Sequence, residues 1–182
     1  GVGRATLALA SNSKPSSILH TDGTANALDA FLHITKNGSI RFNRRIEGTI
    51  TKTETIELRE EYRAALGSTD ITVKQVDLFR LTEGAFEPRD VAVVDLTMLS
   101  AMTCPRRGEV PADLHLLVRP GGKLVVLRPA TENRHAKDEA VFPGFVRAGD
   151  SVGEVGTIAH IIRETRRKHR FAVSECYVFE RT

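Results

Sequence analysis

Glycines and an acidic residue stand near the start of the chain at a spacing that suits a nucleotide-like ligand. Gly1 and Gly3 flank one residue and precede a run typical of a helix, and Asp22 follows about 20 residues later. A glycine turn lets a helix N-terminus approach a ligand, and the later carboxylate can accept hydrogen bonds from both hydroxyls of a ribose. The alternative for Asp22, which precedes Gly23, is an Asx turn that binds its own backbone.

Two more aspartates follow strand-like segments. Asp77 precedes Leu78 and Phe79, so its carboxylate can accept a hydrogen bond from an exocyclic amino group while the two apolar side chains pack against a base. The alternative for Asp77 is a cap of a helix or turn. Asp95 ends the apolar run VAVVD. Because a carboxylate at the end of a buried strand is costly to desolvate without partners, this position favours a functional role.

The segments that carry these residues alternate between helical and strand-like apolar patterns. The sequence predicts helices at 5–10, 25–33, 57–66, 113–118 and 157–169, and strands at 18–22, 71–78, 91–96, 123–128 and 171–181. Residues 39–58 predict an irregular or hairpin-like insertion, and residues 129–153 predict a long loop. This alternation indicates one α/β domain over residues 1–182 with a mostly parallel sheet. In such a sheet the ligand binds beyond the carboxyl ends of the strands, where the aspartates should converge.

The composition narrows the class of protein. With 41% hydrophobic and 27% charged residues, the chain has the make-up of a soluble globular domain, and no apolar stretch is long enough to span a membrane. Its two cysteines, Cys104 and Cys176, lack the spacing of metal ligands, so no metal site is expected and an intracellular, cytoplasmic location is predicted. The net charge of +3 is compatible with nucleic acid binding.

The most specific motif is the passage LLVRPGGKLVV, from Leu116 to Val126. It resembles the passage before the fifth strand of class I, Rossmann-like methyltransferases, which use S-adenosylmethionine. The resemblance covers almost the whole chain and implies an antiparallel C-terminal strand. Residue by residue, it implies that Gly1 and Gly3 hold the methionine side, Asp22 and Gly23 the ribose, Asp77 and Leu78 the adenine, and that Asp95 lies beside the methyl group. The alternative is another nucleotide-binding α/β domain, such as a dehydrogenase.

The same resemblance raises an expectation about the start of the sheet. In that family a buried strand ending in an acid precedes the glycine turn, and the sequence given starts after the place of that strand. We therefore expect the first strand to be missing from this chain. Because a missing central strand would expose the edges of its neighbours, we also expect a partner segment or a partner chain to cover the gap.

The C-terminal segment AVSECYVF resembles the last strand of ribose 2′-O-methyltransferases, whose Lys-Asp-Lys-Glu tetrad deprotonates and orients a hydroxyl. Asp95 and Glu175 match the aspartate and glutamate of that tetrad. Leu127 stands where its second lysine is expected, and Arg128 follows. Arginine stays protonated and cannot act as a base, so the resemblance implies that Arg128 and Glu175 orient or neutralise the acceptor. The alternative for Glu175 is a solvent-facing strand residue beside a basic neighbour.

Basic residues suggest which kind of molecule accepts the methyl group. Arg41, Arg44 and Arg45 form one cluster, and a second cluster closes the helix predicted at 157–169. The second cluster exceeds what a helix C-terminus needs and predicts an RNA-binding surface. Its predicted RNA contacts are Arg163, Arg166, Arg167, Lys168 and Arg170. The leading hypothesis is an S-adenosylmethionine-dependent RNA methyltransferase. The alternatives are an inactive methyltransferase-like subunit that binds RNA or a protein, and a small-molecule or protein methyltransferase.

Overall fold

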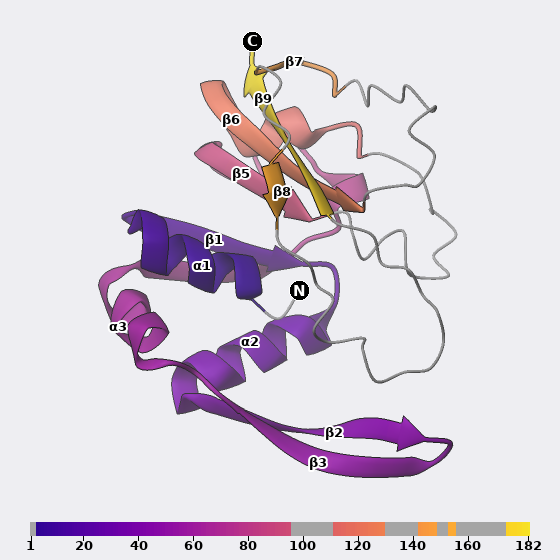
Figure 1. Ribbon diagram of the computed structural model, residues 1–182. Helices are drawn as coiled ribbons and strands as arrows, with labels where there is room; N and C mark the ends of the chain where they lie inside the picture. The colour runs from indigo at the N-terminus through magenta and orange to yellow at the C-terminus, as the bar shows by residue number, and fades with distance from the viewer. Residues whose placement is uncertain (1–2, 96–110, 130–141, 149–152, 156–173) are drawn as a thin grey trace. The chain divides into compact units, whose positions relative to one another are not determined.

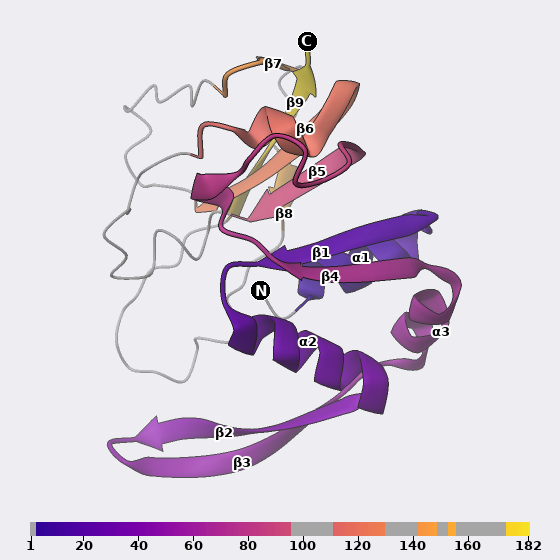
Figure 2. The same ribbon diagram turned by 180° about the vertical axis from the view of Figure 1, so that it is seen from behind.

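The computed structural model describes residues 3–95, 111–129, 142–148, 153–155 and 174–182. The chain divides into two compact units, Gly1–Asp77 and Leu78–Thr182 (Figures 1 and 2). Each unit is described by itself below, and the interpretation of residues 1–182 as one domain stays a prediction. None of the helices in the described ranges is both long and apolar enough to cross a membrane.

The first unit is built on two parallel strands. Strand β1 (Ser17–Asp22) pairs with β4 (Asp70–Gln75), so that the carboxyl ends of both strands lie together, with Asp22 opposite Gln75. Three helices accompany the pair: α1 (Arg4–Ser13), α2 (Ala25–Asn37) and α3 (Glu60–Ser68). The sequence predicts all five elements, with boundaries that differ by a few residues because helix ends depend on caps outside the apolar pattern.

The core of the first unit forms around α2. Leu28, Phe31 and Ile34 recur every three residues on this helix and are buried, as the period of an amphipathic helix requires. The helix ends at Gly38, whose positive φ of 71° is a conformation that glycine adopts without strain, and whose backbone N–H donates to the carbonyl of Ile34. Helix α2 therefore extends four residues past the predicted end at 33 and leads directly into a hairpin.

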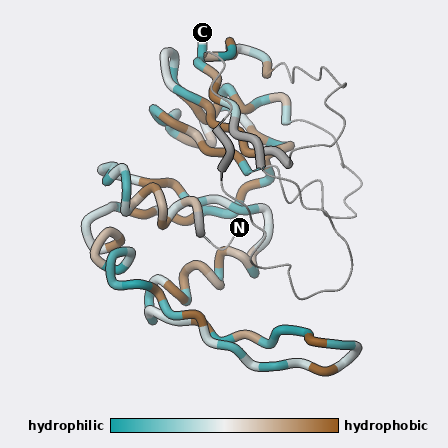
Figure 3. The backbone as a smooth tube through the Cα atoms, viewed as in Figure 1, coloured by the Kyte–Doolittle hydropathy of each residue, from teal (hydrophilic) through white to brown (hydrophobic). Residues whose placement is uncertain are grey.

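That hairpin is the predicted insertion at 39–58. Strands β2 (Ser39–Glu47) and β3 (Ile50–Glu57) pair in antiparallel fashion, with one register shift between Arg45 and Glu47. Figures 1 and 2 show the hairpin running back along α2, so that its tip lies toward the same side as the carboxyl ends of β1 and β4. It is mostly hydrophilic with isolated apolar positions (Figure 3), and nearly all of its residues are exposed.

The second unit is built on a mixed five-stranded sheet in the order β5-β6-β9-β7, with β8 also paired to β9. Strand β5 (Arg89–Asp95) is parallel to β6 (Val118–Pro129), and β9 (Ser174–Arg181) is antiparallel to β6, as predicted for the C-terminal strand. Its core contains Val94, Leu114, Val118, Leu124, Val126, Phe142 and Phe179.

The Pro-Gly-Gly passage, which the resemblance places before a strand, lies inside β6. Val118 is opposite Arg89 and Lys123 is opposite Val91, so residues 119–122 stand opposite Asp90 alone. This irregularity requires glycine twice, because Gly121 has φ 75° and a Cβ on Gly122 would lie 2.7 Å from the backbone oxygen of Asp90.

Other boundaries also differ from the sequence predictions. The segment predicted as a long loop contains β7 (Phe145–Arg147) and the start of β8 (Gly153–Val155). Both strands are too short to give a periodic signal. The helix predicted at 113–118 is a 3-10 turn, Leu114–Leu117, and a second such turn, Leu78–Arg80, follows β4 where a longer strand is predicted. The helix predicted at 157–169 lies outside the described residues.

Candidate functional site

The glycine turn before α1 has a structural role that the sequence does not reveal. Gly3 is the N-cap of α1, is buried, and has φ 92°. A Cβ at this position would overlap the ring of Phe31 on α2. Both the backbone conformation and the close approach of the ring therefore require glycine here. This packing role is compatible with the predicted contact to a methionine side, which stays a prediction, and Gly1 lies outside the described residues.

A buried polar contact ties the start of α1 to the sheet. The hydroxyl of Thr6 and Nδ1 of His20 are hydrogen-bonded at 2.7 Å, and both side chains are buried. The His20 ring also packs against Phe31, with ring centroids 4.1 Å apart. Residues from α1, β1 and α2 thus fix one another beside Gly3. Sequence reasoning missed this cluster, because a threonine and a histidine 14 positions apart show no periodic signal.

Asp22 lies where β1 ends and has partners on the following turn. Its Oδ1 accepts a 2.8 Å hydrogen bond from the backbone N–H of Thr24 and a 2.6 Å bond from the Thr24 hydroxyl. Burial raises the pKa of this carboxyl, but hydrogen bonds to the carboxylate, among them those of Thr24, outweigh burial and hold the pKa below its ordinary value. The Asx-type turn is therefore present, and it orients the carboxylate at the strand end.

The other predicted residues of the first unit gather at the same edge. The backbone N–H of Val76 donates to the Asp22 carbonyl at 2.9 Å, and the Gln75 side chain donates to the Gly23 carbonyl at 3.0 Å. These bonds join the two strand ends, so that Asp22, Gly23 and Asp77 belong to one carboxyl edge. Asp77 is exposed, and Leu78 begins the 3-10 turn that follows.

The three residues predicted to act on the acceptor lie at one end of three adjacent strands of the second unit. Asp95 is opposite Leu127 on β6, and Leu127 is opposite Cys176 on β9. Arg128 is opposite Glu175, one position further along. The register has no shift between residues 123 and 129. Since successive positions of a strand alternate between the two faces, position 95 falls on the other face of the sheet from positions 128 and 175.

Asp95 is exposed, although it ends an apolar run in which Val94 is buried. The prediction of a desolvated acid at this position is therefore wrong, because the apolar character of a strand does not extend to the side chain at its end. Asp95 belongs to the second unit, and its convergence with Asp22 and Asp77 stays a prediction. The five basic residues predicted to contact RNA between 163 and 170 lie outside the described residues.

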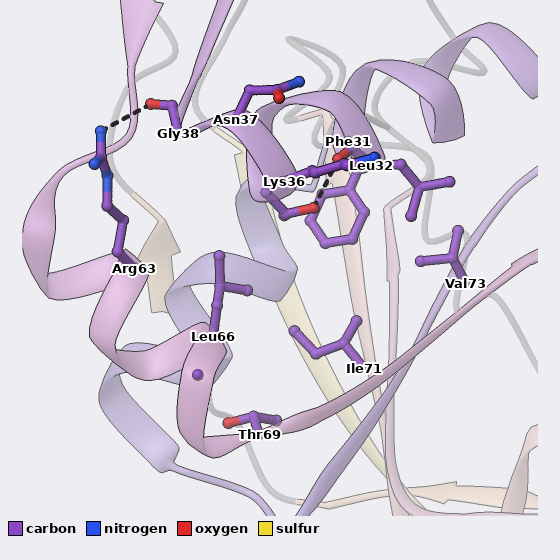
Figure 4. A pocket seen from close by; sticks show the side chains of 12 residues that line it. Phe31, Leu32, Lys36, Asn37, Gly38, Arg63, Leu66, Thr69, Ile71 and Val73 are labelled. Atoms are coloured by element: carbon purple, nitrogen blue, oxygen red, sulfur yellow. Dashed lines mark hydrogen bonds between the residues drawn. The ribbon is translucent and has the colours of Figure 1, made fainter.

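A cavity in the first unit lies away from the predicted edge. It has a volume of about 800 Å³ and opens between α2, α3 and β4 (Figure 4). Its apolar lining includes Phe31, Leu66 and Ile71, and its rim carries Arg63, whose guanidinium donates to the carbonyls of Leu58 and Gly38. Neither an aspartate nor a glutamate lines this cavity. The Arg63 guanidinium thus bonds backbone carbonyls, and the cavity has the character of a packing groove.

No family model matches the sequence, and no curated protein is significantly similar to it. Solved structures do match. The antibiotic-resistance methyltransferase Kmr superposes with a TM-score of 0.53 at 15% identity, covering 100% of this chain and 83% of Kmr. The methyltransferase domain of bacterial CtHen1-C gives a TM-score of 0.48 at 14% identity, covering 99% of this chain and 85% of that one.

The likeness to Kmr concerns the fold. Together with parallel pairing of β1 with β4 and of β5 with β6, and with antiparallel β9, it shows that the chain has the α/β, Rossmann-like fold of class I methyltransferases. The fold predicted from the Pro-Gly-Gly passage is thus confirmed.

Proposed function

We propose that the chain is an S-adenosylmethionine-dependent methyltransferase domain that acts on RNA. The observation that carries the proposal is the carboxyl edge of β1 and β4, where an oriented Asp22 lies beside Gly23 and opposite Gln75, two residues before Asp77. Ligands of open α/β sheets bind at this edge, and the fold is that of known methyltransferases.

The donors and acceptors present at this edge fit the cofactor. A carboxylate oriented by Thr24 is suited to accept hydrogen bonds from two ribose hydroxyls. Asp77 would accept from the adenine amino group, with Leu78 against the base. Gly1 and Gly3 would bound the methionine side, and Asp95 would lie near the methyl group.

When bound, the cofactor supplies an electrophilic methyl group on a sulfonium. Methyl transfer is an in-line displacement, so the contribution of the protein is alignment and, for a hydroxyl or amine acceptor, assistance with the proton. Asp95 is the residue of the second unit suited to accept such a hydrogen bond. Arg128 and Glu175 are opposite each other across β6 and β9, at positions on the other face of the sheet from Asp95, and would orient or neutralise a part of the acceptor that extends past the strand ends to that face.

Methyl transfer can be measured directly with the full-length chain, S-adenosylmethionine carrying a tritiated methyl group, and total RNA. We expect ribonuclease-sensitive label in the RNA, and a loss of about tenfold or more for Asp95→Asn. Asp90→Asn is the matched control, because Asp90 is exposed on the same strand and pairs with Arg119. Label that appears only in protein or small molecules would reject RNA as the acceptor.

One observation favours a second candidate, an inactive methyltransferase-like subunit that binds RNA or a protein. Leu127 occupies the register position beside Asp95 where the resemblance to 2′-O-methyltransferases places a lysine. A leucine can neither take up a proton nor bind the acceptor oxygen. Cofactor binding without any transfer to RNA, protein or small molecules would support this candidate over the first.

A further inference from the structure

The hairpin β2–β3 has two chemically different faces. Its register pairs Arg41 with Thr55, Asn43 with Thr53, and Arg45 with Thr51, which places these six residues on one face, here called the arginine face. The opposite face carries Ile40, Phe42, Ile50 and Ile56 together with Arg44, Lys52 and Glu54. Two side-chain interactions agree with this division, because the Thr53 hydroxyl donates to the Asn43 side chain at 2.8 Å and Arg44 pairs with Glu54 at 3.2 Å.

The six residues of the arginine face include two arginines and no acid, and Glu57, opposite Ser39, follows on the same face beyond Thr55. Arg41 and Arg45 are exposed, and in the described part of the chain neither side chain has an ion pair or hydrogen bond. Arg44, on the other face, is paired with Glu54. The remaining side chains of the arginine face are hydroxyls and one amide, so the face consists of a fork-shaped cation at each end and neutral hydrogen-bonding groups between.

This set of groups matches the phosphate backbone of a nucleic acid. Phosphate contacts in protein–nucleic acid complexes come from arginine and lysine together with serine, threonine and asparagine side chains. At about 3.4 Å per residue, Arg41 and Arg45 stand about 14 Å apart along the strand, enough to contact more than one phosphate. A protein surface without acidic side chains would leave these two cations to be desolvated without a partner, which is costly.

The hairpin is also placed to serve the proposed site. It leaves the end of α2 and runs back so that its tip lies toward the side of the carboxyl ends of β1 and β4, within the same unit (Figures 1 and 2). A strand of RNA held on the arginine face would thus be held on the side where the proposed cofactor site lies.

We propose that the arginine face of the hairpin binds the phosphate backbone of the RNA acceptor through Arg41 and Arg45. The inference rests on the proposed function for the identity of the acceptor. The binding itself follows from the exposure, charge and register of the hairpin.

Fluorescence anisotropy with a labelled, unstructured single-stranded RNA tests the proposal, over a series of salt concentrations and with the full-length chain. For the double variant R41Q/R45Q we expect affinity about 5- to 20-fold lower at low salt. We also expect the slope of log K against log salt to fall in magnitude by about 1.4, since each lost single-strand phosphate contact removes about 0.7. The matched control is R44Q, on the opposite face, for which we expect less than a twofold change.

Two results would overturn the proposal: native affinity and slope in R41Q/R45Q, or an equal loss in R44Q or in Phe42→Ser. Because all these positions are exposed, the variants should keep the melting temperature of the native protein. Calorimetry with S-adenosylmethionine on R41Q/R45Q separates the two proposals. If R41Q/R45Q binds the cofactor and its affinity for RNA is unaltered, the hairpin proposal alone fails. Loss of RNA affinity in a protein that never binds the cofactor means that the proposed function alone fails.

Discussion

The core of the first unit and the hairpin that leaves it use the same residue type in opposite ways. Phe31 on α2 is 1% exposed and packs against His20 and the backbone of Gly3. Phe42 on β2 is 36% exposed, among residues that are nearly all open to water. In the core, neighbours from three elements fix the position of the Phe31 side chain. In the hairpin, the strand register alone fixes on which face a side chain lies, and the exposed side chains remain available to a partner.

Truncating the two phenylalanines tests this contrast with the largest expected effect. Phe31→Ala should lower the free energy of unfolding by about 3–5 kcal/mol, because it removes a fully buried ring and leaves a cavity. Phe42→Ala should lower it by less than about 1 kcal/mol, as expected for a surface position. Urea denaturation followed by circular dichroism measures both. Equal losses would mean that the hairpin has a packed face in solution.

Substitution of two glycines tests the same contrast between a packed position and an open one. Gly3→Ala should cost about 2–4 kcal/mol, since alanine at a left-handed φ is strained and its Cβ would overlap the Phe31 ring. Gly67→Ala in α3 is the control, because nothing lies within 4 Å of its Cβ and φ is not in the left-handed region. We expect Gly67→Ala to be neutral or slightly stabilising. A stability of Gly3→Ala equal to that of the control would remove the packing role assigned to Gly3.

The sequence predicts the elements of the fold better than their ends. The apolar spacing of α2 and the run before Asp95 predict a helix and a strand at the observed places. The continuation of α2 from residue 33 to the turn at Gly38, the bulge at Gly121 and Gly122, and the three-residue strand β7 escape prediction. Each of these features depends on backbone conformation or on pairing with distant residues, neither of which leaves a periodic pattern.

In the candidate site, too, some features could be predicted from the sequence and others could not. Asp22 and Asp77 could be predicted, because they directly follow strands, and the parallel pairing of β1 with β4 brings the two strand ends together. The contact of Gly3 with Phe31 and the bond between Thr6 and His20 could not, since they join elements far apart in the sequence. The two faces of the hairpin depend on its register, which the sequence of residues 39–58 does not fix.

The central claim is that the carboxyl edge of β1 and β4 binds S-adenosylmethionine through Asp22, and isothermal titration calorimetry of the full-length chain tests it most directly. We predict binding that Asp22→Asn weakens by about tenfold or more, because the charge-assisted bonds to the ribose are lost. Asp29→Asn, at an exposed position on α2, should bind like the native protein. Absence of binding, or equal affinity of the Asp22→Asn and Asp29→Asn variants, would contradict the account.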